Sequence, residues 1–129
     1  MAGLFRVLVV EDEPVIRELV RSLLSDLDCE VDLAPHAADA LKMAKTQGYD
    51  LILLDVVLPP VGSIQLDGVA LCRMLRADPR TVKTPVYMLT AKAKKADVDI
   101  AMKAGANGYI HKPFRAAELM DLVAKLRKT

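Results

Sequence analysis

Reactive side chains follow four of the five short apolar runs in this 129-residue sequence. Glu11 and Asp12 follow the first run, Asp55 the third, Thr90 the fourth and Lys112 the fifth. Three carboxylates gathered at one place would repel one another, and a hard divalent cation with oxygen ligands relieves that repulsion. These residue types therefore predict a site for Mg²⁺ (or Mn²⁺) beside an ammonium group and a hydroxyl group.

A carboxylate in such a site can act as a nucleophile toward phosphorus and form an acyl phosphate. This reaction depends mainly on positioning and on neutralising the phosphoryl oxygens, which the cation, Lys112 and the Thr90 hydroxyl could do together. Taken singly, Asp12 or Asp55 could equally be a helix cap or a turn residue, and Lys112 a solvated surface charge. Their coincidence at four run ends favours a site for phosphoryl chemistry.

The reactive side chains can form one site only if the strands that precede them end at the same edge of a sheet. Apolar runs rich in β-branched residues predict strong strands at residues 4–10, 51–54 and 86–89, and weaker strands at 31–34 and 108–111. Runs this short, bounded by charged or turn residues, are typical of strands buried on both faces of a sheet.

Helices are predicted between the strands, where apolar residues recur at steps of three and four. They fall within residues 15–24, 37–45, 69–75, 98–104 and 119–126. The alternation predicts a (βα)₅ fold of the α/β class, with a mostly parallel sheet covered by helices on both faces. Ligands of such sheets bind beyond the carboxyl ends of the strands, which is where the reactive residues are expected.

The composition is that of a soluble globular domain, with 53% hydrophobic and 27% charged residues. The formal net charge of +1 gives no general attraction to nucleic acid or to an anionic membrane, so we expect neither as a direct partner. The first residues show no secretory signal, and no apolar stretch approaches the ~20 residues needed to cross a bilayer. We therefore expect one cytoplasmic domain over residues 1–129, with Cys29 and Cys72 reduced.

The motifs taken together resemble the receiver domain of bacterial two-component response regulators. The matching segments, in the family's order and over nearly the whole chain, are VLVVEDEP, DLILLDVVLP, Asp67-Gly68, VYMLTA and GYIHKPF. The resemblance implies a flavodoxin-like three-layer sandwich whose parallel sheet has the strand order 2-1-3-4-5. It also implies a phosphorylation switch in two-component or phosphorelay signalling, and not an enzyme that acts on other substrates.

The resemblance implies a role for each residue of the acidic site. Asp55 would be the phosphoacceptor. Asp12 and Asp55 would ligate Mg²⁺ together with the backbone carbonyl of Val57, and Glu11 would act nearby through water. Lys112 would pair first with Asp55 and then with the phosphoryl group.

Other residues would contact or sense the phosphoryl group. The resemblance implies that the Thr90 hydroxyl and the Ala91 N–H contact it. Thr90 and Tyr109 would form a switch pair, in which the ring turns into the space that the hydroxyl vacates; an ordinary half-buried aromatic is the alternative for Tyr109. The bond from Lys112 to Pro113 would be cis and would aim the lysine inward.

Partners also follow from the resemblance. Phosphate would come from a histidine kinase or a histidine phosphotransfer protein, and the output would be a contact with a downstream protein through residues 94–104 and 117–128. The chain would be a monomer or a weak homodimer. The alternative function is a phosphorylation-independent interaction module on the same fold.

Two segments depart from the family's pattern. Residues 60–66 lengthen the loop after Asp55 by several residues. This is either a tolerated surface insertion or a partner contact, or partial lid, formed by Val61, Ile64 and Leu66. The lysines within residues 92–95 are either part of a solvated loop or contacts to the phosphoryl group or to an acidic partner.

Overall fold

A computed structural model describes residues 4–58, 67–91 and 94–127 of the chain. Strands and helices alternate along it from β1 to α5. The long loop at residues 60–66, with its two interpretations, lies outside the described residues, and so does Lys92. What was predicted for these positions stays a prediction.

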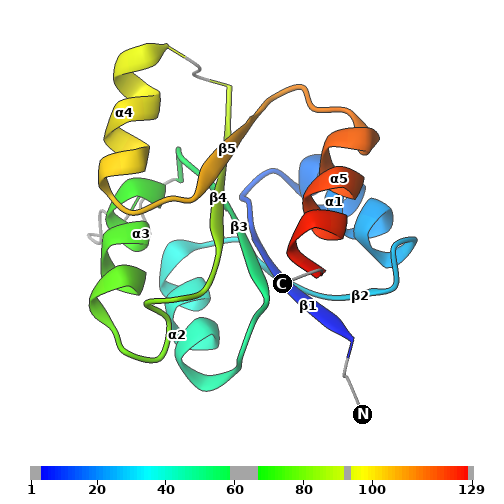
Figure 1. Ribbon diagram of the computed structural model, residues 1–129, viewed down its shortest axis with the longest axis horizontal. Helices are drawn as coiled ribbons and strands as arrows, with labels where there is room; N and C mark the ends of the chain where they lie inside the picture. The colour runs from blue at the N-terminus through cyan, green and yellow to red at the C-terminus, as the bar shows by residue number, and fades with distance from the viewer. Residues whose placement is uncertain (1–3, 59–66, 92–93, 128–129) are drawn as a thin grey trace.

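A parallel sheet of five strands forms the centre of the molecule (Figure 1). Its order is β2-β1-β3-β4-β5, and every neighbouring pair is parallel. The (βα)₅ fold and the strand order expected from the sequence are confirmed. The strands are β1 (Phe5–Val10), β2 (Cys29–Ala34), β3 (Leu51–Asp55), β4 (Val86–Thr90) and β5 (Gly108–His111).

Helices cover both faces of this sheet, with α1 and α5 on one face and α2, α3 and α4 on the other (Figure 1). This gives the three layers that the family resemblance implied. The helices are α1 (Pro14–Ser25), α2 (Ala37–Thr46), α3 (Gly68–Ala77), α4 (Lys95–Lys103) and α5 (Ala116–Arg127).

Two apolar cores form because successive strand residues point to opposite faces of the sheet. Leu8 and Leu54 belong to the core under α2, α3 and α4, whereas Val9 and Leu53 belong to the core under α1 and α5. All five residues of β3 are buried, as expected of a central strand covered on both faces. The sheet thereby provides a firm base for the residues that follow its carboxyl ends.

Two helices begin earlier than the sequence predicted. α4 begins at Lys95 instead of Val98, and α5 begins at Ala116 instead of Leu119. The polar first turns carry no apolar repeat, so the periodicity that marks a helix is not visible there. Neither difference moves a predicted site residue.

Both cysteines, Cys29 and Cys72, are buried and free. Burial raises the pKa of the Cys29 and Cys72 thiols and so keeps them protonated. Among the described helices, none is long and apolar enough to cross a membrane.

Candidate functional site

The carboxyl ends of the strands meet at one edge of the sheet. Val10 of β1 pairs with Leu54 of β3, and Asp55 pairs with Leu89 of β4, so the residues that follow these strands lie level. A pocket of about 220 Å³ opens at this edge. Its lining contains Asp12, Glu13, Asp55, Val57, Thr90, Ala91 and Lys112.

A larger hollow of about 590 Å³ lies at the opposite edge, where β1, β3 and β4 begin. Its lining includes Arg80 and Lys83, and its carboxylate, Asp50, accepts a hydrogen bond from the Arg6 N–H at 2.8 Å. Volume alone does not identify a site. Among the described residues, the cluster of three potential metal-ligating side chains lies at the carboxyl edge, and the chemistry therefore places the candidate site there.

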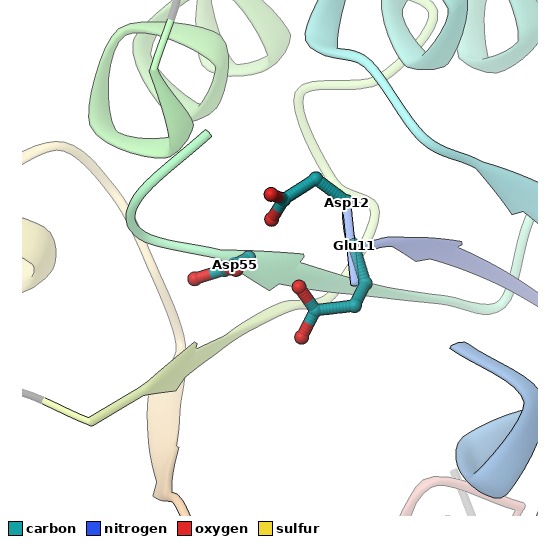
Figure 2. Close-up of side chains that lie close together, drawn as sticks. All are labelled: Glu11, Asp12 and Asp55. Carbon is teal, nitrogen blue, oxygen red and sulfur yellow. The ribbon is translucent and has the colours of Figure 1, made fainter. Parts of the chain in front are cut away.

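Three carboxylates form the acidic centre of the site (Figure 2). One oxygen each of Glu11, Asp12 and Asp55 lies within 4.8 Å of the other two. Glu11 is fully buried, and Asp55 is 6% exposed. Negative charges this close repel, and burial strengthens the repulsion because little water screens it.

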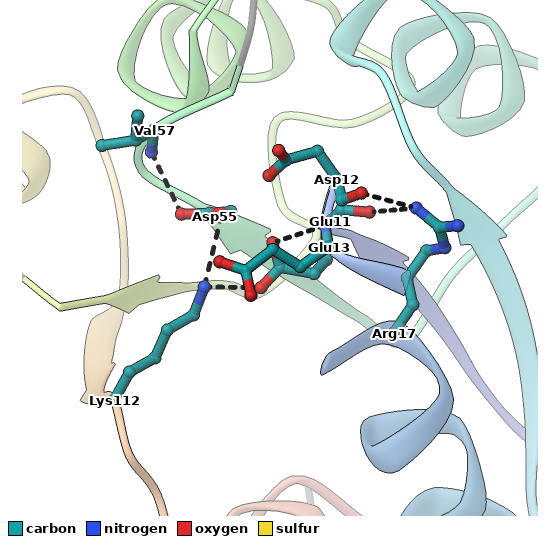
Figure 3. A network of polar contacts seen from close by, with 7 residues as sticks. All are labelled: Glu11, Asp12, Glu13, Arg17, Asp55, Val57 and Lys112. Carbon is teal, nitrogen blue, oxygen red and sulfur yellow. Dashed lines mark hydrogen bonds and ion pairs between the residues drawn. The ribbon is translucent and has the colours of Figure 1, made fainter. Parts of the chain in front are cut away.

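Lys112 supplies a positive charge to the cluster (Figure 3). Its Nζ lies 2.5 Å from Glu11 Oε1 and 3.3 Å from Asp55 Oδ2. The expected pairing with Asp55 is therefore present, but the closer contact is with Glu11. Burial by itself would lower the pKa of Lys112. The Glu11 and Asp55 carboxylates raise this pKa by more, so the net shift is upward.

The pKa of Glu11 is raised in this crowded, buried cluster. Burial raises the pKa of Glu11, and the side chain of Asp55 raises it further, whereas Lys112 offsets part of the rise. Among the described residues, the Lys112 ammonium contacts two of the three carboxylates, those of Glu11 and Asp55. The cluster keeps an excess of negative charge that a cation would neutralise.

Asp55 is oriented by one contact on each carboxylate oxygen. The Val57 N–H donates to Oδ1 at 3.1 Å, and Lys112 donates to Oδ2 at 3.3 Å. The side chain of Val57 is 57% exposed, so its contribution to the site comes from its backbone. These contacts aim the carboxylate into the pocket.

Gly68 allows α3 to begin directly against the backbone of Asp55. A Cβ at position 68 would lie 2.1 Å from the Asp55 carbonyl oxygen. The Gly68 N–H donates to Val56 O at 3.1 Å, and the Asp67 side chain caps α3 by accepting from the Ala70 N–H at 2.8 Å. The sequence pointed to the Asp-Gly pair, but its steric role was missed because a close backbone approach appears only in the packed fold.

The remaining predicted residues surround this centre. Thr90 is buried, Ala91 is exposed, and both line the pocket. The peptide bond between Lys112 and Pro113 is cis. Tyr109 lies on β5 with 45% of its surface exposed, and its exchange with Thr90 stays a prediction.

The oxygen donors fit a hard divalent cation. Hard cations prefer carboxylate and carbonyl oxygens, and Mg²⁺ keeps several of its own waters when only a few protein ligands are offered. The clustered oxygens of Glu11, Asp12 and Asp55 meet this requirement, and the pocket is open enough for water. The charge excess of the cluster favours the same cation.

Sequence comparisons find similar segments in regulatory proteins. The family described as "Response regulator receiver domain" matches residues 7–124. The transcriptional regulatory protein DltR of Streptococcus agalactiae is 40% identical over 115 residues, which are 89% of this chain and 48% of DltR. The DNA-binding response regulator MtrA of Mycolicibacterium smegmatis is 36% identical over 124 residues, which are 95% of this chain and 51% of MtrA. The chain spans about half the length of these curated relatives.

Solved structures share the fold over nearly their whole length. The receiver domain of a sensor histidine kinase from Pseudomonas aeruginosa PAO1 has a TM-score of 0.88 and 33% identity, covering 98% of this chain and 100% of that chain. That structure has a magnesium ion coordinated in its active-site cleft. The chemotaxis protein CheY4 of Vibrio cholerae has a TM-score of 0.87 and 27% identity, covering 96% of this chain and 99% of that chain.

Proposed function

Because this chain belongs to the response regulator receiver domain family, we propose that it is a signalling switch that accepts a phosphoryl group on Asp55. The donor would be a phosphohistidine on a histidine kinase or on a histidine phosphotransfer protein. One observation carries the proposal: the buried Asp55 carboxylate faces a pocket with the Lys112 ammonium 3.3 Å away. A carboxylate held in this way is suited to attack phosphorus.

The transfer would form one bond and break another. An Asp55 oxygen attacks phosphorus, the P–N bond to the donor imidazole breaks, and that nitrogen keeps the electron pair. The Lys112 Nζ would then shift from Asp55 Oδ2 to a phosphoryl oxygen, which carries more charge. The Thr90 hydroxyl and the Ala91 N–H line the same pocket and would donate to other phosphoryl oxygens.

Glu11, Asp12 and Asp55, together with the Val57 carbonyl, would hold Mg²⁺ in this site. When bound, Mg²⁺ neutralises the phosphoryl oxygens as charge develops on them. Glu11 has a second task, because its contact keeps the Lys112 ammonium charged and close while no phosphoryl group is present.

The output of the switch would be a change in a protein-binding surface, made through Thr90 and Tyr109 and through residues 94–104 and 117–128. The chain would act as a switch and not as an enzyme on other substrates. DltR and MtrA are named as transcriptional and DNA-binding regulators, but the net charge of +1 gives this chain no general attraction to DNA. The absence of direct nucleic-acid contact, the cytoplasmic location and the monomer or weak homodimer state remain part of the proposal.

Intact mass after incubation with acetyl phosphate, with and without Mg²⁺, tests the proposed function. We expect one phosphoryl adduct on the parent protein in Mg²⁺, none on Asp55→Ala, and little adduct without the cation. Asp99→Ala removes an exposed carboxylate of α4 and should keep the adduct. A folded parent that takes no phosphoryl group in Mg²⁺ would refute the proposal and favour the phosphorylation-independent interaction module.

A further inference from the structure

The loop between β1 and α1 carries two of the three acidic residues but lacks the usual cap of a helix start. Glu13, the residue before α1, has an extended backbone, and its side chain makes no capping hydrogen bond. Pro14 follows at the first helical position, where a missing N–H leaves no helical bond unmade. Something other than a side-chain cap must hold this loop.

Arg17 holds the loop from the first turn of α1 (Figure 3). Its Nη1 donates to the carbonyl oxygen of Glu11 at 3.0 Å and to the carbonyl oxygen of Asp12 at 3.1 Å. Hydrogen bonds from a charged guanidinium are stronger than those between neutral groups. One side chain thus ties down two successive peptide groups.

These two carbonyls belong to the peptide groups on either side of the Asp12 Cα. Peptide groups are planar, so fixing the planes before and after Asp12 fixes its backbone dihedrals and the direction of its side chain. We propose that Arg17 is a positioning residue that aims the Asp12 carboxylate into the cation site. The use of this positioning in signalling rests on the proposed function, whereas the effect of Arg17 on cation binding does not.

Charge alone predicts the opposite of positioning. A guanidinium near three carboxylates weakens the attraction that a divalent cation feels, so its removal would tighten cation binding. Loss of positioning would weaken cation binding instead, because the Asp12 oxygen would leave the cluster. The sign of the change therefore distinguishes the two effects.

Mg²⁺ titrations of the unphosphorylated protein, followed by melting temperature, test the role of Arg17. Arg17→Gln removes both the charge and the clamp. Arg17→Lys keeps the charge, but its ammonium ends one bond short of the Nη1 that donates to both carbonyls. Arg21→Gln is the matched control: it removes the same charge one turn further along α1, where the guanidinium contacts Glu18 at 2.6 Å. We expect Arg17→Gln to need about ten times more Mg²⁺ than the parent for the same rise in melting temperature, the lower end of the loss seen when support of a metal ligand is removed. The Mg²⁺ concentration that Arg17→Lys needs should lie between those of the parent and Arg17→Gln, and Arg21→Gln should match the parent.

Unchanged or tighter Mg²⁺ binding by Arg17→Gln would overturn the proposal, as would an equal loss in Arg21→Gln. Should Arg17→Gln fail to fold, Arg17→Lys decides: weaker binding supports positioning, and parent-like binding overturns it. A parent that shows no response to Mg²⁺ also overturns it. A parent that binds Mg²⁺ but takes no phosphoryl group defeats the proposed function, while a weakened Arg17→Gln would still support positioning.

Discussion

At the scale of single residues, the carboxylates that would bind a cation also destabilise the metal-free protein. One oxygen each of Glu11, Asp12 and Asp55 lies within 4.8 Å of the other two, and in the described part of the chain Lys112 pairs with Glu11 and Asp55. Asp12→Ala should therefore stabilise the metal-free protein by about 1 kcal/mol, the size of a like-charge contact at this separation near water. Thermal unfolding in EDTA measures the change, with Asp99→Ala as an exposed control expected within about 0.5 kcal/mol of the parent. Destabilisation by Asp12→Ala would contradict the crowding.

Glu11 should also make stability depend on pH, with a sign set by its environment. Burial raises the pKa of Glu11 above its ordinary value of 4.5. The folded state therefore binds this proton more tightly than the unfolded state does. The stability that protonated Glu11 contributes is fully present below pH 4.5 and is lost as the pH rises through the folded pKa. Glu11→Gln should accordingly gain stability relative to the parent as the pH rises toward about 7 in EDTA. Paired melting curves across this range measure the difference, and a difference that does not vary with pH would refute the assignment.

At the scale of elements, the start of α3 packs directly against the backbone at the end of β3. Gly68→Ala would put a Cβ 2.1 Å from the Asp55 carbonyl oxygen, so α3 or the loop after β3 would have to move. We expect a loss of about 1–3 kcal/mol in the free energy of unfolding, as for other overpacked positions, together with slower reaction with acetyl phosphate. Urea unfolding and a time course of intact mass measure the two effects.

Gly48→Ala is the matched control for this substitution, because a Cβ at position 48 would have no neighbour within 4 Å. Its stability should change by no more than about 1 kcal/mol, and its reaction should match the parent. Parent-like behaviour of Gly68→Ala would show that α3 does not press on Asp55.

Arg76 joins several elements at the opposite end of the sheet. It donates from Nη1 to Thr84 O at 2.7 Å, from Nε to Gly105 O at 2.8 Å and from Nη2 to Asn107 Oδ1 at 2.8 Å. Arg76→Met keeps the apolar stem but leaves these acceptors without the guanidinium, so we expect a loss of about 2–4 kcal/mol by urea unfolding. Arg73→Met, an exposed position on the same helix, should stay within about 0.5 kcal/mol of the parent. Equal effects of the two substitutions would contradict the assigned role.

The elements also show which parts of the structure could be predicted from sequence. Every strand lies within two residues of its predicted bounds, because apolar runs mark buried strands directly. The start of α4 at Lys95 was missed because its first turn has no apolar repeat. The strand order came from the family resemblance, since periodicity alone does not order strands.

The site was predictable in part for a similar reason. Carboxyl ends of parallel strands share one edge, so the meeting of Glu11, Asp55 and Lys112 followed from their places after the strands. The roles of Arg17 and Gly68 did not follow, because their partners are backbone atoms and leave no pattern in side-chain types. The closer contact of Lys112 with Glu11 likewise depends on side-chain reach within the packed site.

At the scale of the whole molecule, two cores share one sheet and should unfold together. Leu54 of β3 faces one core and its neighbour Leu53 faces the other, so loss of either core would expose the central strand. Single domains of this size usually unfold in one step. The acidic site draws on Asp55 at the end of β3 and on residues that directly follow β1 and β5, so it exists only while the sheet is formed.

Mg²⁺ should therefore raise the melting temperature of the whole chain as one transition. A cation that binds only the folded state stabilises it by about 2.7 kcal/mol at one hundred times its dissociation constant. Calorimetry over a Mg²⁺ series, with NaCl of equal ionic strength as the control for screening, measures the response. Asp12→Ala and Asp55→Ala should each lose most of it. If two transitions appear and Mg²⁺ shifts only one of them, the two cores unfold separately. If NaCl reproduces the shift, or if both variants keep it, the cation binds outside the acidic cluster.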